Sequence, residues 1–170
     1  PNWFVPEAEL EKGVEAKYKY SWGKQNWFDY HRAEHMAIRE NVGIYEMLSF
    51  SKIRVKGVDA MDYLQYICAN DVDVPIGKIV YTQWLNNKGG IEADVTITRL
   101  AESDYLVVGG AACNNRDMNW LEQNMPEGAN CALFDATSSE NCLAIMGPNS
   151  RDFLQSMTDY DLSHEYMPFA

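Results

Sequence analysis

The stretch Gly89-Gly90-Ile91-Glu92-Ala93-Asp94-Val95-Thr96-Ile97-Thr98-Arg99 says most about this chain. The two glycines predict a tight turn, and the residues after them alternate between apolar and polar, as a half-buried strand does. If Val95 and Ile97 point into the core, then Asp94 and Thr96 lie on the opposite face of the strand. A carboxylate in that position is often an ordinary solvated residue, so the rest of the chain has to decide whether Asp94 has a function.

The composition is that of a globular domain, and its charge is unevenly distributed. The chain has 170 residues, of which 46% are hydrophobic and 12% aromatic, and this is enough to fill the core of one domain. Residues 1–57 carry nine Lys or Arg against eight Asp or Glu, whereas residues 58–170 carry five against seventeen. Proteins that bind nucleic acid use a basic face to neutralise phosphates, so we expect no nucleic-acid partner.

The lack of a visible targeting signal and the spacing of the cysteines both indicate a reducing compartment. No apolar run approaches the ~20 residues of a membrane span, and no secretory signal is visible, so we expect no membrane partner. The four cysteines form no C-x-x-C pair, and we interpret them as reduced and mostly buried thiols. These features fit a bacterial cytoplasm or a mitochondrial matrix. The cysteines are Cys68, Cys113, Cys131 and Cys142.

Two motifs that bind metals or nucleotides in other proteins are incomplete here. His31 and His35 are four residues apart on a predicted helix, but no third ligand accompanies them, and we predict no metal site. Gly109-Gly110 follows a strand and precedes a helix, as a phosphate-binding turn does. Because a third glycine is missing, we interpret the pair as an ordinary turn and expect this chain not to bind FAD or NAD by itself.

Hydrophobic periodicity and turn residues predict an α+β fold, in which helices cover one face of a mainly antiparallel sheet. The first predicted helix has Asn26 as its N-cap and Gly43 as its stop. The predicted elements, in order, are a helix over 27–40, a strand over 51–55, a helix over 58–69, strands over 79–85, 91–100 and 105–108, a helix over 114–125, strands over 132–134 and 143–145, and a helix from Gly147-Pro148 through Met157.

The predicted hairpin of 79–85 and 91–100 gives Asp94 an aromatic neighbour. Tyr81 lies on the first of these strands and can approach Asp94 across the turn. A carboxylate beside an aromatic hydroxyl can hold a flat nitrogenous ligand, and it can take a proton from an amine. The pair is therefore the candidate site.

Several stretches match, in order and spacing, the motifs of one family. They are 41–47, 52–60, 64–72, 77–82, Leu85-Asn86, Gly89-Gly90-Ile91 with Asp94, Arg116-Asp117 with Trp120, and Met146-Gly147-Pro148. Together they resemble the folate-binding aminomethyltransferases, typified by the T-protein of the glycine cleavage system. The resemblance covers roughly residues 27–170 and implies a fold like the first domain of the T-protein.

The amino-terminal residues resemble one branch of these proteins. The matching stretches are similar to dimethylglycine and sarcosine dehydrogenases, in which an FAD-dependent amine-oxidising domain precedes a folate domain. They are Asn2-Trp3-Phe4, Tyr20-Ser21-Trp22-Gly23, Asn26-Trp27-Phe28 and residues 79–86. The resemblance implies that residues 1–26 are a linker or arm and that 27–170 are the N-terminal part of a folate-binding domain, truncated at its C-terminal end. FAD would then bind only to the parent protein, outside this chain, and the FAD oxidase domain would be a partner.

The resemblance also implies a reaction and a set of site residues. In the family, oxidation of an N-methyl amine gives an iminium or formaldehyde, which tetrahydrofolate captures as 5,10-methylene-tetrahydrofolate. The catalytic aspartate of the family matches Asp94, which also binds folate. Folate contacts fall on Tyr81 and Thr96, and a family asparagine that binds the pterin falls near Gly110, where this chain has no side chain.

Two other functions stay open for the same fold. The domain could be a non-catalytic folate-binding or structural module, which the glycine at 110 favours. It could also be a folate-dependent demethylase, against which the dehydrogenase-like linker argues.

Because family members continue past Ala170 into further strands, we expect the fragment to expose an unpaired edge near Met167 and to self-associate.

Overall fold

The computed structural model describes residues 12–13 and 17–168, and these residues form two compact units. One unit consists of Glu46–Leu143. The other consists of the described residues up to Tyr45 together with Ala144–Pro168.

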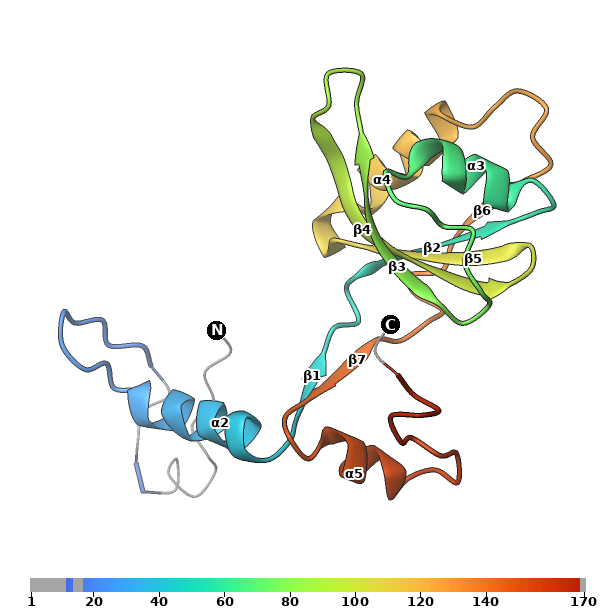
Figure 1. The fold of residues 1–170 in the computed structure, drawn as a ribbon. Coiled ribbons are helices and arrows are strands. Elements are labelled where there is room, and N and C mark those ends of the chain that lie inside the picture. The colour runs from blue at the N-terminus through green and yellow to red at the C-terminus, as the bar shows by residue number, and fades with distance from the viewer. Residues whose placement is uncertain (1–11, 14–16, 169–170) are drawn as a thin grey trace. The chain divides into compact units, whose positions relative to one another are not determined.

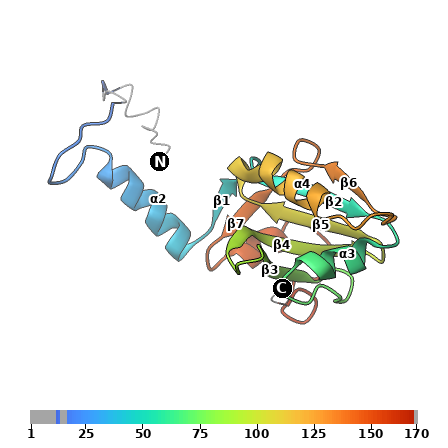
Figure 2. The same cartoon turned by 90° about the horizontal axis from the view of Figure 1, so that it is seen from above.

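The larger unit is a five-stranded antiparallel sheet covered on one face by helices (Figures 1 and 2). Its strands lie in the order β3-β4-β5-β2-β6, and the helices α3 and α4 pack on the same side. This arrangement confirms the predicted α+β fold. The elements are β2 Ser51–Lys56, α3 Ala60–Ile67, β3 Ile79–Leu85, β4 Ile91–Ala101, β5 Asp104–Gly109, the 3₁₀ turn η1 Ala111–Cys113, α4 Asn114–Gln123 and β6 Ala132–Asp135.

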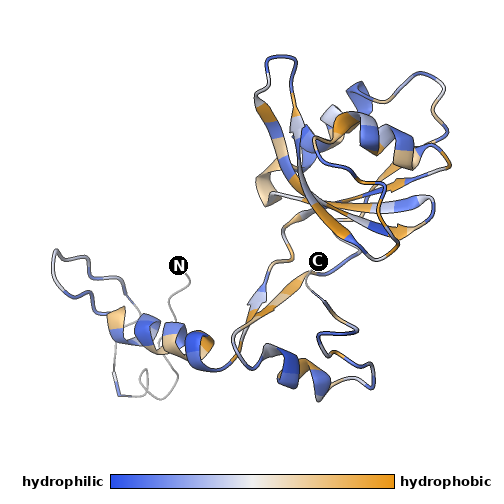
Figure 3. Cartoon of the chain, viewed as in Figure 1, coloured by the Kyte–Doolittle hydropathy of each residue, from blue (hydrophilic) through white to orange (hydrophobic). Residues whose placement is uncertain are grey.

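The core lies between this sheet and its two helices. Alternate residues of each central strand are buried there, and the hydropathy colouring of Figure 3 changes from residue to residue along the strands accordingly. The Tyr63 hydroxyl on α3 donates a hydrogen bond of 2.5 Å to the carbonyl oxygen of Leu121 on α4, which joins the two helices. The buried apolar cluster consists of Ile53, Val55, Ala60, Tyr63, Leu64, Val72, Trp84, Ala93, Val95, Ile97, Tyr105, Val107 and Leu121.

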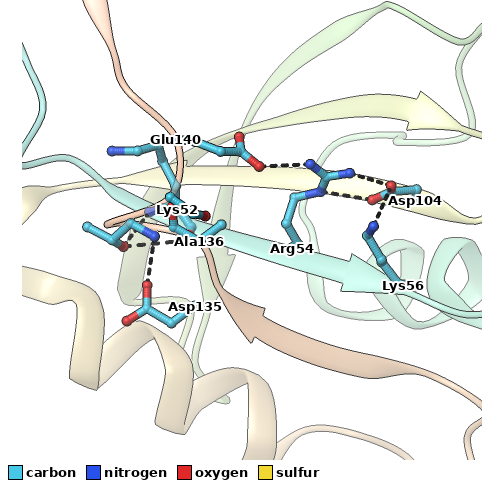
Figure 4. Close-up of polar contacts among 9 residues, drawn as sticks. Lys52, Arg54, Lys56, Asp104, Asp135, Ala136 and Glu140 are labelled. Carbon is cyan, nitrogen blue, oxygen red and sulfur yellow. Dashed lines mark hydrogen bonds and ion pairs between the residues drawn. The ribbon is translucent and has the colours of Figure 1, made fainter.

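Charged side chains occupy the outer face of the sheet over β2, β5 and β6 (Figure 4). The Arg54 guanidinium donates to both carboxylate oxygens of Asp104 and, at 2.8 Å, to Glu140. Lys56 forms a second ion pair with Asp104 at 3.1 Å. Lys52 is buried, and its ammonium donates to two backbone carbonyls, those of Leu48 and Phe50. These contacts tie the segments before β2 and after β6 to the sheet.

The smaller unit contains α2 Phe28–Glu40, β1 Gly43–Glu46, β7 Leu143–Met146 and α5 Ser150–Gln155, with β1 and β7 paired as a two-stranded sheet. The strand β1 was not predicted, and the prediction that Gly43 stops the helix is wrong. The helix already ends at Glu40, and Asn41 donates its N–H to Ala37. Gly43 opens β1 where a Cβ would come within 2.6 Å of the Ile38 side chain, so close packing explains this glycine.

Other element ends also differ from the predictions. Asn26 is not an N-cap: its side chain accepts from the Lys19 N–H and donates to the Lys17 carbonyl, and α2 begins at Phe28 without a side-chain cap. The helix predicted over 58–69 is shorter in the structure, where α3 covers Ala60–Ile67. Val58 precedes the helix and is 71% exposed. Likewise, α5 covers only Ser150–Gln155 of the final helix.

The arm predicted over residues 1–26 is described only in part. Residues 17–26 contain no helix or strand, and residues 1–11 lie outside the described residues. The domain boundary near residue 26 therefore stays a prediction. Among the described helices, none is long and apolar enough to cross a membrane.

The four cysteines are free, but they are half-buried rather than mostly buried. Burial raises the pKa of the Cys68 thiol to about 11. This thiol is therefore protonated at neutral pH and is not a nucleophile.

Candidate functional site

The hairpin of β3 and β4 separates its residues between two faces, as its sequence predicts. Val95 and Ile97 are 2% and 1% exposed and lie in the core. Asp94, between Ala93 and Val95, is exposed on the outer face. The helices lie on the other side of the sheet, so Asp94 faces away from them.

The turn of the hairpin is built by one asparagine. The backbone N–H and C=O of Asn86 bond to Gly90 and Gly89, and its side-chain oxygen accepts from the N–H groups of Lys88 and Gly90 at 2.9 and 3.0 Å. Gly89 has a φ of 77°, which a side chain would disfavour. The side-chain amide of Asn86 then donates to Glu92 at 2.7 Å, two residues before Asp94. This turn sets the register of the two strands.

The register brings Tyr81 and Asp94 together on the outer face. Tyr81 is the direct partner of Thr96, and Gln83 is the direct partner of Asp94. Tyr81 and Asp94 are diagonal neighbours, and Asp94 raises the pKa of Tyr81 because a carboxylate beside the hydroxyl favours the neutral phenol. Tyr81 is 58% exposed, so the pair is accessible to a ligand.

Asp94 has no cationic partner among the described residues. None of the described Lys, Arg or His side chains forms an ion pair with it. By contrast, Asp104 pairs with Arg54 and Lys56, and Asp117 pairs with Arg116. An ionised carboxylate held only by neutral donors can attract a cation or accept a proton.

The predicted position of Gly110 completes the same face from a third strand. Thr96 pairs with Val108 of β5, and the same register places Gly110, one residue beyond β5, alongside Asp94. Gly110 has φ −64° and ψ 139°, and a Cβ built there would touch only the Cys113 sulfur, at 3.6 Å. The structure therefore brings Tyr81, Asp94 and Thr96 together, and Gly110 follows the end of the neighbouring strand with room for a side chain.

The neighbouring glycine has a different role. A Cβ at Gly109 would come within 3.0 Å of the Asp117 carboxylate and 3.4 Å of Val95. Asp117 is 2% exposed, and its carboxylate accepts two hydrogen bonds from the Arg116 guanidinium. Close packing thus requires glycine at 109, in agreement with the interpretation of Gly109-Gly110 as structural.

One residue of this cluster was not predicted. The side-chain amide of Gln83 donates to Asp94 Oδ1 at 3.4 Å, and Gln83 lowers the pKa of Tyr81, against the effect of Asp94. Strand alternation places Gln83 on the same face as Tyr81, two residues away, but only the register of the hairpin reveals that it lies opposite Asp94.

Comparison with known proteins identifies the family to which this chain is similar. The model of the GCVT N-terminal domain family matches residues 1–170. The chain is 38% identical, over 153 residues, to a 4-methylaminobutanoate oxidase (formaldehyde-forming) from Paenarthrobacter nicotinovorans, covering 90% of this chain and 18% of that protein. It is 33% identical to the mitochondrial sarcosine dehydrogenase of Mus musculus, covering 100% of this chain and 22% of that protein.

A solved structure shares the fold. The glycine cleavage system aminomethyltransferase T from Bartonella henselae superposes with a TM-score of 0.70 at 27% identity, covering 89% of this chain and 42% of that chain. The chain thus spans less than half the length of each of these similar proteins.

Proposed function

Since the chain belongs to the GCVT N-terminal domain family, we propose that it is a tetrahydrofolate-binding domain for one-carbon transfer, in which Asp94 is the catalytic residue. The observation that carries the proposal is the exposed Asp94 carboxylate, which lies diagonally across from Tyr81 and is unpaired with any described cation. Bound tetrahydrofolate would supply the nitrogen that accepts the one-carbon unit as 5,10-methylene-tetrahydrofolate.

The side chains of the outer face fit the requirements of such a ligand. Asp94 can accept a hydrogen bond or a proton from a ligand nitrogen, and its unneutralised charge favours a cationic iminium nearby. Tyr81 offers an exposed aromatic ring and hydroxyl beside it. Thr96 lies directly opposite Tyr81 and adds a hydroxyl, and the backbone at Gly110 leaves space on the other side.

We further propose that the chain is part of an FAD-dependent dehydrogenase or oxidase of an N-methyl amine. The support is its similarity to the sarcosine dehydrogenase and the 4-methylaminobutanoate oxidase, of which it spans 22% and 18%. In this proposal, FAD binds in the oxidase domain of the parent chain, which delivers an iminium or formaldehyde to the folate site. The compartment would be a bacterial cytoplasm or a mitochondrial matrix.

The test is Asp94→Asn in the intact protein that contains this chain. Loss of a positioned proton acceptor should lower the rate of 5,10-methylene-tetrahydrofolate formation by roughly 10²–10⁴-fold. Amine oxidation should continue at the wild-type rate, so formaldehyde should accumulate. The matched control is Asp62→Asn, which changes an exposed aspartate on α3, the helix that covers the other face of the sheet.

A non-catalytic folate-binding module is the second candidate, and the glycine at position 110 favours it. Without a side chain at 110, a ligand loses one polar contact beside Asp94. This alternative predicts that Asp94→Asn leaves product formation at the wild-type rate and weakens only the binding of 5-formyl-tetrahydrofolate, measured by calorimetry. A normal rate in the variant would therefore reject the catalytic role of Asp94.

A further inference from the structure

Two carboxylates on the outer face of β4 are each held by a neutral amide from the β3 side of the hairpin. Asn86 donates to Glu92 at 2.7 Å, and Gln83 donates to Asp94 Oδ1 at 3.4 Å. A neutral donor fixes the direction of a carboxylate without neutralising its charge, whereas Arg54 both fixes and neutralises Asp104. The hairpin thus orients Asp94 while it keeps the charge that a catalytic carboxylate needs.

The position of Gln83 gives it a direct hold on Asp94. The two residues are direct cross-strand partners in the antiparallel pair, so their Cβ atoms lie at the closest separation that two strands allow. On the opposite flank, the register places Gly110, which has no side chain. Across the strands, the side chains that can hold Asp94 therefore come from β3, and they are those of Gln83 and Tyr81.

We infer that Gln83 is a positioning residue for Asp94, and that its side-chain N–H holds the carboxylate in the orientation used for one-carbon transfer. This inference rests on the proposed function. Without the bond, an exposed aspartate would exchange among its rotamers in water. Tyr81 would then be the one side chain left to hold Asp94 across the strands, although its hydroxyl is also the group that a ligand would contact.

Three substitutions separate the donor from the size and polarity of the side chain. Gln83→Leu removes the polar group, Gln83→Glu keeps the shape but replaces the donor with an acceptor, and Gln83→Lys restores an N–H donor. In the intact protein, we expect the Leu and Glu variants to lower kcat for 5,10-methylene-tetrahydrofolate formation about tenfold, with little change in KM for tetrahydrofolate. The Lys variant should not recover the loss, because its ammonium would neutralise the charge of Asp94.

The matched control is Gln123→Leu, which makes the same chemical change on α4, where the side-chain amide donates to Asn119. It should leave kcat unchanged. Wild-type kcat in both the Leu and Glu variants, with product lost in Asp94→Asn, would overturn the role of Gln83 and leave the proposed function standing.

A second measurement needs no ligand and no activity. In ¹H–¹⁵N spectra of the chain, Asp94→Ala should move the side-chain NH₂ signals of Gln83 and leave those of Gln123 in place. Unmoved Gln83 signals would overturn the inference, because the amide would then not be bonded to this carboxylate. If Asp94→Asn keeps full product formation, the proposed function fails, and with it the catalytic meaning of the Gln83–Asp94 contact.

Discussion

Tyr81 and Asp94 are diagonal neighbours across the hairpin, and Asp94 raises the pKa of Tyr81, although neither residue is the direct cross-strand partner of the other. Tyr81 pairs with Thr96 and Asp94 pairs with Gln83, so this interaction runs diagonally over the outer face. Its effect is to couple the ionisation of Tyr81 to the charge of Asp94.

This coupling predicts that Asp94→Asn lowers the pKa of Tyr81. The carboxylate of Asp94 is the main cause that raises this pKa, because a negative acceptor holds the phenol proton and opposes a second negative charge. A neutral amide at 94 does neither, so the phenolate should form at lower pH. The measurement is the pH titration of the Tyr81 Cζ resonance by ¹³C NMR. An identical midpoint in wild type and variant would show that the two groups do not interact in solution.

Gly110→Asn should strengthen the binding of 5-formyl-tetrahydrofolate, because it adds an amide beside Asp94 without strain. The backbone at 110 has an ordinary φ of −64°, and a Cβ meets only the Cys113 sulfur at 3.6 Å. We expect an increase in affinity of about tenfold, as one net hydrogen bond provides. Calorimetry checks the affinity, and thermal unfolding should be unchanged.

The neighbouring position supplies the contrast for this experiment. Gly109→Asn places a Cβ 3.0 Å from the buried Asp117 carboxylate, so it should lower the unfolding temperature instead of improving binding. If both variants destabilise the protein equally, the description of Gly110 as an open position is wrong.

Gly57→Ala should be among the most destabilising single substitutions in the larger unit. Gly57 has a φ of 147°, and a Cβ there would lie 2.1 Å from the Asn130 carbonyl oxygen, which is rigid backbone. We expect the free energy of unfolding to fall by more than about 4 kcal/mol. The control is Gly77→Ala, where φ is 91° but nothing lies within 4 Å of the added Cβ. There we expect the free energy of unfolding to fall by only about 1–2 kcal/mol. Urea unfolding of both variants measures the difference.

Asp104→Asn should destabilise the protein near neutral pH and much less in acid. Burial alone would raise the pKa of Asp104, but hydrogen bonds from Arg54 and Lys56 outweigh it and lower the pKa. The stability contributed by the ionised carboxylate is therefore present above its ordinary pKa of about 4 and is lost as the pH falls through the lower, folded value.

We expect Asp104→Asn to cost about 1–3 kcal/mol at pH 7, because the Arg54 and Asp104 side chains are 21% and 19% exposed. Urea unfolding at pH 7 and at low pH measures the change. Glu122→Gln, an exposed change on α4, should stay within about 0.5 kcal/mol at both pH values. A cost for Asp104→Asn that does not shrink in acid would contradict the role of its charge.

Local signals were sufficient for much of the fold. The Asn-Asn-Lys-Gly-Gly turn and the alternation after it predicted the hairpin and the exposed face of Asp94, because strand periodicity and turn geometry are properties of a few adjacent residues. The same local signals misplaced the helix cap at Asn26 and missed the strand β1. A strand of four residues pairs with β7, nearly one hundred residues later, and no local pattern marks such a partner.

The amino-acid sequence by itself determined the α+β class, the family resemblance and the candidate residues Tyr81, Asp94, Thr96 and Gly110. Only the tertiary structure decided that Gln83 lies opposite Asp94 and that β5, which Gly110 follows, pairs with β4. It also decided that Asp104 is neutralised by Arg54, whereas Asp94 is not. The physical reason is that strand register and the pairing of charges are set by contacts between segments distant in the chain, whereas periodicity records only which face each residue occupies.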